Sequence, residues 1–371
     1  MSQRRLPTLH EPLRRLGLTP RLALTLAIGA AGMFLARWSH FPGGAITGVL
    51  IITGAARLLG APLADPPAWL KSLGRILLGL ALGTRVTPAT ITAIVNSFGP
   101  VMLMIAMMMG LGVIIAYAMQ RYARMPLVTA LCSSAPGGLS AMVVVSEELG
   151  GEGAVVASMQ LVRFFTVQMI VPVVVRARFP MSAAAAPLGA TAAPEDILWR
   201  LGVLLIAGVL VGLLADRYKV PSGSLLAGMI LGAVLNPLWL RLPGVPSGWQ
   251  LVSQVIIGAG VGVTLTRAAL RTFRPYALPG LLMTAGLIVS GLALGWALDL
   301  VTELDLVTSI VGSAPGGADT MIILASELGA DPQLVAAMHT ARLLLIVLLM
   351  PVLVRLMSGR RAAQPQVAQS S

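Results

Sequence analysis

Apolar runs separated by short polar stretches follow one another along almost the whole chain. Each run is close to the ~20 residues with which a helix crosses the ~30 Å hydrocarbon core of a bilayer, so we predict an all-α polytopic membrane protein of about ten to twelve helices. The predicted segments are 22–38, 45–60, 69–87, 98–119, 126–149 and 153–175 in the first half, and 201–215, 222–240, 248–266, 276–298, 305–328 and 332–354 in the second.

The second half of the chain repeats the first. A shift of 179 residues lays Glu148 on Glu327 and Arg163 on Arg342, and it superimposes two Ser-Ala-Pro-Gly-Gly motifs without a gap. Their residues are Ser134, Ala135, Pro136, Gly137 and Gly138 in the first copy and Ser313, Ala314, Pro315, Gly316 and Gly317 in the second. Such self-similarity marks a duplicated structural unit.

The duplication and the polar stretches together predict the domain organisation. We expect a basic cytoplasmic N-terminus (1–21), a first membrane repeat (22–176), a linker (177–196), a second membrane repeat (197–357) and a polar C-terminal tail (358–371).

Composition excludes the class of soluble proteins. The chain is 57% hydrophobic and 11% charged, whereas about a quarter of the residues of a soluble domain are charged. Five arginines precede the first apolar run, which predicts that the N-terminus lies in the cytoplasm. We expect the protein to lie in the inner membrane of the cell. The net charge of +12 is dispersed at segment ends, so it indicates membrane lipid as a partner and no direct contact with nucleic acid. Cys132 is the only cysteine, and we expect no metal and no cofactor.

Each Ala-Pro-Gly-Gly sequence lies in the middle of a fifth apolar segment. Proline removes a backbone donor and glycine loosens the chain, so the helix is predicted to break or re-enter there. Irregular backbone at membrane depth is tolerated only where it is buried in protein or lines a water-filled cavity. Breaks at matching positions of two repeats indicate a substrate-binding site, with a simple kink as the alternative.

Arg163 and Arg342 lie near the middle of the sixth segments, between apolar neighbours. An intramembrane charge is costly and by default marks a functional site with a partner. We expect that partner to be Glu148 or Glu327, or a bound anion. The alternative is a structural ion pair that locks the sixth segment to the fifth.

Two further polar residues, both in the second repeat, are candidates for ion coupling together with Glu148 and Glu327. His339 lies one helical turn before Arg342, and its ordinary pKa of about 6.5 suits proton transfer. Asp319 follows the second break, where a carboxylate either stabilises the N-terminus of its own helix or holds a cation or proton.

The charge pattern leaves the orientation of the repeats open. A crossing fifth segment gives six crossings per unit and parallel repeats, whereas a re-entrant one gives five and inverted repeats. The charges near 267–274 and 299–305 favour inverted repeats under the positive-inside rule.

With these motifs the chain resembles the AbrB membrane protein family over residues 20–357. The resemblance rests on the doubled Ser-Ala-Pro-Gly-Gly motif, on Gly-x-x-x-Gly at 79–83 and 258–262, and on Pro-Val-x-Val-Arg at 172–176 and 351–355. It implies a duplicated membrane unit. Members are labelled regulators of gene expression or ammonia monooxygenases, and no catalytic residue carries over.

The sequence predicts a secondary transporter of a small solute, with an anion indicated by the arginines, and not an enzyme. No nucleotide-binding motif occurs, so the driving force would have to be an ion gradient or the solute's own gradient, and we expect an ion gradient. The alternative is a membrane sensor that acts indirectly on gene expression. Monooxygenase chemistry needs a cluster of metal ligands, but His10, His40 and His339 are the only histidines. Expected partners are the solute or ion, membrane lipid and, as a candidate, a second copy of the chain.

Overall fold

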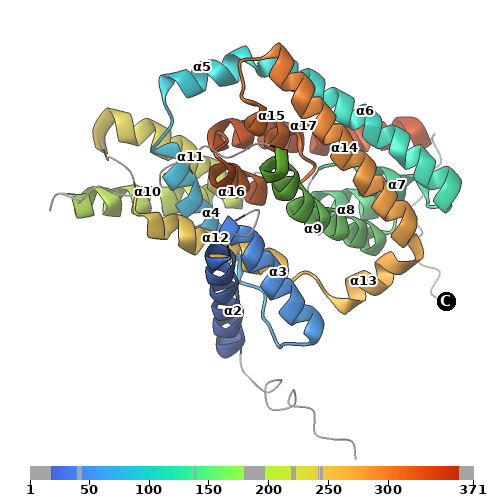
Figure 1. Cartoon of the computed structure of the whole chain (residues 1–371), viewed down its shortest axis with the longest axis horizontal. Coiled ribbons are helices and arrows are strands. Elements are labelled where there is room, and N and C mark those ends of the chain that lie inside the picture. The colour runs from blue at the N-terminus through green and yellow to red at the C-terminus, as the bar shows by residue number, and fades with distance from the viewer. Residues whose placement is uncertain are drawn as a thin grey trace, which may run out of the picture. The chain divides into compact units, whose positions relative to one another are not determined.

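The computed structural model describes residues 18–39, 44–137, 139–178, 197–218, 223–240, 242 and 245–358, and these consist of helices joined by short loops (Figure 1). No strand occurs among these residues, so the all-α prediction is confirmed. Most of the N-terminus, the linker and the C-terminal tail, together with Gly138, lie outside the described residues.

The helices reproduce the twelve predicted segments. In the first repeat they are α2 (Leu18–Trp38), α3 (Gly44–Leu59), α4 (Ala68–Gly83), α6 (Phe98–Ala123), α7 (Leu127–Ser134), α8 (Leu139–Glu148) and α9 (Gly153–Arg178). In the second they are α10 (Ile197–Arg217), α11 (Gly223–Leu235) with the π-helical turn η1 (Asn236–Leu240), α12 (Ser247–Gly262), α14 (Ala277–Val301), α15 (Leu306–Ser313), α16 (Ala318–Leu328) and α17 (Pro332–Ser358).

Two short helices lie outside the predicted segments. They are α5 (Pro88–Asn96) and α13 (Arg267–Phe273), the latter continued by the 3-10 turn η2 (Arg274–Tyr276). They begin at equivalent positions of the two repeats and connect the third segment to the fourth. Both are far shorter than a membrane span, so hydropathy alone does not reveal them.

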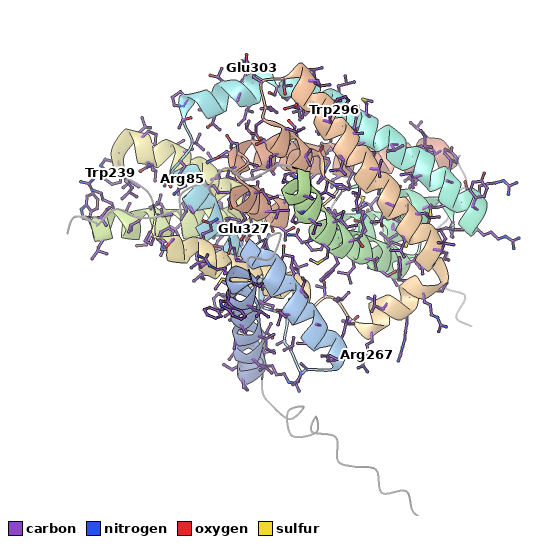
Figure 2. The ribbon with its side chains drawn as sticks, viewed as in Figure 1. Arg85, Trp239, Arg267, Trp296, Glu303 and Glu327 are labelled. Carbon is purple, nitrogen blue, oxygen red and sulfur yellow. The ribbon has the colours of Figure 1, made fainter. Side chains whose placement is uncertain are left out.

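Seven helices of the described part are long and apolar enough to cross a bilayer. Large apolar side chains such as Leu103, Ile206 and Val289 are mostly exposed on these helices. Trp239 and Trp296 are exposed as well (Figure 2). Lipid is the solvent in which such exposure costs nothing, so the chain is a multi-pass integral membrane protein.

The chain forms two compact units, and each contains helices of both repeats. Unit 1 comprises Met1–Asn96, Gln168–Arg267 and Ala318–Ala336, and unit 2 comprises Ser97–Val167, Ala268–Gly317 and Ala337–Ser371. The boundary after Gly317 separates α15 from α16, whereas α7 and α8 both belong to unit 2. The two halves of the first broken helix therefore belong to one unit, whereas the two halves of the second belong to different units.

Unit 1 is held together by close helix packing at small residues. A Cβ on Gly79 of α4 would lie 2.1 Å from the carbonyl oxygen of Leu225 in α11, and one on Gly83 would lie 2.1 Å from that of Met229. Glycine is required at both positions because backbone occupies the space of a side chain. The Gly-x-x-x-Gly spacing thus has the packing role that is usual in membrane helices.

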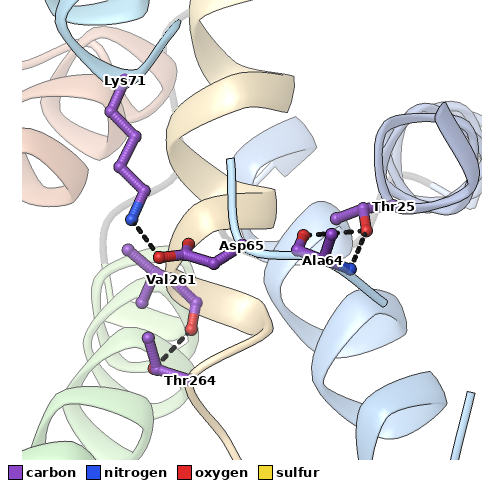
Figure 3. A network of polar contacts seen from close by, with 6 residues as sticks. All are labelled: Thr25, Ala64, Asp65, Lys71, Val261 and Thr264. Atoms are coloured by element: carbon purple, nitrogen blue, oxygen red, sulfur yellow. Dashed lines mark hydrogen bonds and ion pairs between the residues drawn. The ribbon is translucent and has the colours of Figure 1, made fainter. Parts of the chain in front are cut away.

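Polar contacts tie the loop before α4 to its neighbours in unit 1 (Figure 3). Thr25 Oγ1 donates to the carbonyl of Ala64 at 3.0 Å and accepts from the backbone N–H of the same residue at 3.0 Å. Lys71 Nζ pairs with Asp65 Oδ2 at 2.6 Å. These contacts fix the approach to α4, which carries Lys71 and Arg75.

Unit 2 has a core that is rich in methionine. The buried side chains come from α6, α7, α8, α9, α14 and α17, and include Met119, Met142, Met159, Met283 and Met350. Methionine is unbranched and fills irregular gaps. This suits a core that must pack around two interrupted helices.

Candidate functional site

Both predicted helix breaks are present. The first lies between α7, which ends at Ser134, and α8, which begins at Leu139, and the second separates Ser313 from Ala318. Ala135 and Ala314 have extended backbone, with ψ of 129° and 137°. Each precedes a proline, and proline disfavours helical backbone in the residue before it. The local sequence alone therefore accounts for where α7 and α15 end.

The two breaks are anchored by the same contacts within unit 2. Ser134 Oγ donates to the carbonyl of Gly112 in α6 at 2.8 Å, and Ser313 Oγ donates to that of Gly291 in α14 at 2.7 Å. Donors and acceptors are both 179 residues apart. The duplication seen in the sequence is thus preserved in individual hydrogen bonds.

Arg163 of α9 binds the carbonyl oxygens at the first break. Its side chain is 4% exposed, and Nη1 lies 3.2 Å from the carbonyl oxygens of Ser133, Ser134 and Ala135. Its Nη2 donates to Oε1 of Gln160, whose own Nε2 donates to the Cys132 carbonyl at 2.7 Å. The guanidinium group thereby serves as the donor that α7 lacks at its interrupted end.

Arg342 of α17 does the same at the second break and is 2% exposed. Nη1 donates to the Ala314 carbonyl at 2.8 Å and Nη2 to the Gly316 carbonyl at 3.2 Å. Our expectation of a carboxylate partner for the two arginines is wrong, since both donate to backbone carbonyls. Carbonyl oxygens without helical partners carry partial negative charge at a helix C-terminus, so they partly balance the positive charge of each arginine.

His339 occupies the position of Gln160 and makes equivalent contacts. Its Nδ1 lies 2.8 Å from Arg342 Nη2, and its Nε2 lies 3.0 Å from the carbonyl of Val311. A guanidinium group can only donate and a carbonyl can only accept, so Nδ1 is bare and Nε2 carries the proton. This neutral tautomer holds Arg342 in place, and a second proton would point at the guanidinium group. The geometry favours positioning over proton transfer.

The remaining candidates for ion coupling lie on α8 and α16. In unit 1, Asp319 Oδ2 is 3.9 Å from Arg75 Nε, and Glu327 Oε1 accepts from the backbone N–H of Ala45 at 2.9 Å. In unit 2, Glu148 is the last residue of α8. The structure brings each arginine to its own break, and it places Asp319 and Glu327 at opposite ends of α16.

The first break is closed in this conformation. A cavity of about 10 Å³ lies beside it in unit 2, lined in part by Gly112, Ser134 and Pro136. This is about the volume that a single water requires. A Cβ on Gly137 would lie 2.6 Å from Ile346 of α17, so the tight packing accounts for the small cavity.

Sequence reasoning missed two residues that the structure places beside Glu327. Gln254 Nε2 donates to Glu327 Oε1 at 3.3 Å, and Gln250 Nε2 donates to Ser326 Oγ at 2.9 Å. The available signal was that Gln254 and Gln250 are the counterparts of Arg75 and Lys71 in the first repeat. Among the described residues, no three His, Cys, Asp or Glu side chains lie together as metal ligands.

Comparison with known proteins places these features in a family. The model of the family described as "Transition state regulatory protein AbrB" matches residues 2–91 and 66–358. A Bacillus subtilis (strain 168) protein, "Uncharacterized protein YhjN", is 26% identical over 359 residues, which cover 90% of this chain and 92% of that protein. An Escherichia coli (strain K12) protein described as "Putative regulator AbrB" is 28% identical over 356 residues, covering 94% and 97%. The chain belongs to the AbrB family.

Proposed function

We propose that this membrane protein is a secondary transporter of a small anionic solute, driven by an ion gradient, and that it is not an enzyme. The observation that carries the proposal is the pair of helix breaks at matching positions, each bound by a buried arginine. Interrupted helices in duplicated membrane proteins supply polar groups at membrane depth without leaving them exposed to lipid.

The arginines supply the positive charge that an anion requires. Their present acceptors are neutral, namely carbonyl groups for both arginines and, for Arg342, Nδ1 of His339 as well. In addition, Nε of Arg342 is buried without a hydrogen-bond partner among the described residues. A guanidinium group binds a carboxylate or phosphate more strongly than a neutral carbonyl, and it does so through two parallel bonds. An anion entering the break would therefore compete with the carbonyl groups for the same donors, which couples solute binding to rearrangement of the break.

The proposed setting is the inner membrane of the cell, with the N-terminus in the cytoplasm. The five arginines of the first 21 residues support that orientation. Partners in this proposal are the solute, the coupling ion and membrane lipid, with a second copy of the chain as a candidate and no direct contact with nucleic acid.

Binding of a panel of small acids to the purified protein tests the proposal. Monocarboxylates, dicarboxylates, phosphate and sulfate are added in turn, with neutral sugars and amines as controls, and thermal unfolding is followed in detergent. We expect at least one acid to raise the melting temperature, because a ligand that binds only the folded state stabilises it. Arg163→Lys and Arg342→Lys keep the charge but lose the forked geometry, so both variants should respond less. The site would be refuted if no acid raised the melting temperature. It would also be refuted if the acids raised the melting temperatures of both lysine variants as much as that of the wild type.

A membrane sensor for the same solute is the second candidate. It is favoured by the description of the Escherichia coli relative as a regulator. A sensor binds the acid without moving it, so solute uptake by reconstituted protein separates the two functions.

A further inference from the structure

The two helix breaks lie beside the same short stretch of α17 within unit 2. Arg342 binds the carbonyl oxygens of the second break at 2.8 and 3.2 Å. One helical turn later, Ile346 lies against the first break, where a Cβ on Gly137 would be 2.6 Å from its side chain. Gly137 is two residues from Ala135, whose carbonyl oxygen Arg163 binds at 3.2 Å. One arginine is therefore bound at each of two neighbouring breaks.

The two arginines belong to one buried region. Apolar side chains of α9, which carries Arg163, and of α17, which carries Arg342, contribute to the same core of unit 2. Both arginines are buried, and the positive charge of Arg163 acts on Arg342. Unit 2 thus holds two like charges within reach of each other.

No carboxylate among the described residues forms an ion pair with either arginine. The ion pairs of that part of the chain lie in unit 1. The side chains that do bind the arginines are Gln160 and the neutral His339. Two buried like charges are costly, because each loses its hydration and each repels the other. The carbonyl groups at the breaks balance only part of this charge.

One donor in this region has no acceptor. Nε of Arg342 is buried without a hydrogen bond among the described residues, while its Nη atoms bind Ala314, Gly316 and His339. A carboxylate accepts two parallel N–H bonds from one guanidinium group, and Nε with a neighbouring Nη supplies such a pair. An acid at the breaks would therefore satisfy a donor that the protein leaves unsatisfied.

We propose that one small dicarboxylate binds both arginines together, with one carboxylate at Arg163 and the other at Arg342. Two negative charges balance two positive charges, and equivalent arginines from two repeats suit equivalent acid groups joined by a short spacer. This solute class rests on the proposed function, because it concerns the same site. It adds that a single dianion binds both breaks, in place of one anion at each.

Binding of labelled malonate, succinate, glutarate and adipate to the purified full-length chain tests the proposal by equilibrium dialysis. The monomethyl ester of each acid is the matched control, because it keeps the spacer and loses one charge. Acetate, phosphate and sulfate are measured beside them. We expect at least one dicarboxylate to bind at one per chain, and its half-ester to bind at least about tenfold more weakly because it loses a charge-assisted contact.

Three results would overturn the proposal. In the first, acetate binds at two per chain with the affinity of the dicarboxylates, which means one anion at each break. In the second, phosphate or sulfate binds more tightly than every dicarboxylate. Both of these leave the proposed transport of an anion standing. In the third, no acid binds at all, which refutes the proposed function together with the dicarboxylate site.

Variants assign the binding to the two arginines. Arg163→Lys and Arg342→Lys keep the charge but lose the forked geometry, so each should bring the affinity for the dicarboxylate towards that of the half-ester. Arg200→Lys is the control, since Arg200 lies in unit 1 and also donates to a backbone carbonyl, that of Leu240 at 3.1 Å. It should bind the dicarboxylate as the wild type does. Unchanged affinity in a folded Arg342→Lys protein would contradict the shared site, and the half-ester comparison decides the proposal on the wild type alone where a variant does not fold.

Discussion

Replacing His339 by glutamine copies the residue of the first repeat into the second. Gln160 already donates to the Cys132 carbonyl and accepts from Arg163. His339→Gln can retain both equivalent bonds, so we expect it to cost less than about 1 kcal/mol of unfolding free energy. His339→Leu loses both. Hydrogen bonds between membrane helices average ~0.6 kcal/mol and reach ~1.7, which predicts a loss of about 1–3 kcal/mol.

The assay is unfolding of the purified protein in mixed detergent micelles, with Gln160→His as the reciprocal control. We expect His339→Gln and Gln160→His to remain near the wild type and His339→Leu to unfold at a clearly lower denaturant concentration. A glutamine variant as unstable as the leucine variant would refute the assigned tautomer and contacts. If His339 instead carried the coupling proton, His339→Gln would fold normally and lose ion-coupled activity.

Further substitutions probe the packing and the anchors of the breaks. Gly79→Ala places a methyl group 2.1 Å from a backbone oxygen and should cost about 1–3 kcal/mol, whereas Gly258→Ala meets the movable side chain of Val49 at 2.8 Å and should cost less. Gly110→Ala in α6 meets nothing within 4 Å and is the matched control, expected to leave thermal stability unchanged or raised. Ser134→Ala and Ser313→Ala each remove one bond to a neighbouring helix, so each should cost about 0.6–1.7 kcal/mol in the same unfolding assay. Equal melting temperatures for the alanine variants at Gly79 and Gly110, or no loss in either serine variant, would contradict the contacts described.

Hydropathy predicted the helical segments well because length and apolarity are what a bilayer demands of a helix. The breaks were predicted for an equally local reason, since proline acts on the residue before it and on the donor it lacks. The short helices α5 and α13 escaped prediction because neither has the length or the apolarity of a span. Segmentation from sequence is therefore reliable here only where the membrane imposes it.

The partners of the buried arginines could not be predicted from residue types. A carboxylate is the usual partner of an intramembrane arginine, and Glu148 and Glu327 were the obvious candidates. The breaks, however, leave backbone carbonyl oxygens without partners in their own helix. Every residue has such a carbonyl group, so residue types do not show which of them are available as acceptors. Breaking α7 and α15 creates acceptors, and Arg163 and Arg342 bind them.

The division into two units could not be predicted from the sequence either. The repeats are contiguous in sequence, yet each unit takes helices from both, and α16 lies in a different unit from α15. This division follows from packing between distant segments, such as the contact of Gly79 with Leu225, that no local pattern encodes.

Solute uptake into proteoliposomes tests the central claim most directly. Labelled small acids are presented to reconstituted wild-type protein with and without an inward Na⁺ or proton gradient, beside the Arg342→Lys variant and protein-free liposomes. The account predicts that at least one class of acid accumulates above the protein-free level when a gradient is imposed, and that Arg342→Lys reduces this accumulation. If every acid stays at the protein-free level under each gradient, the transport claim is contradicted.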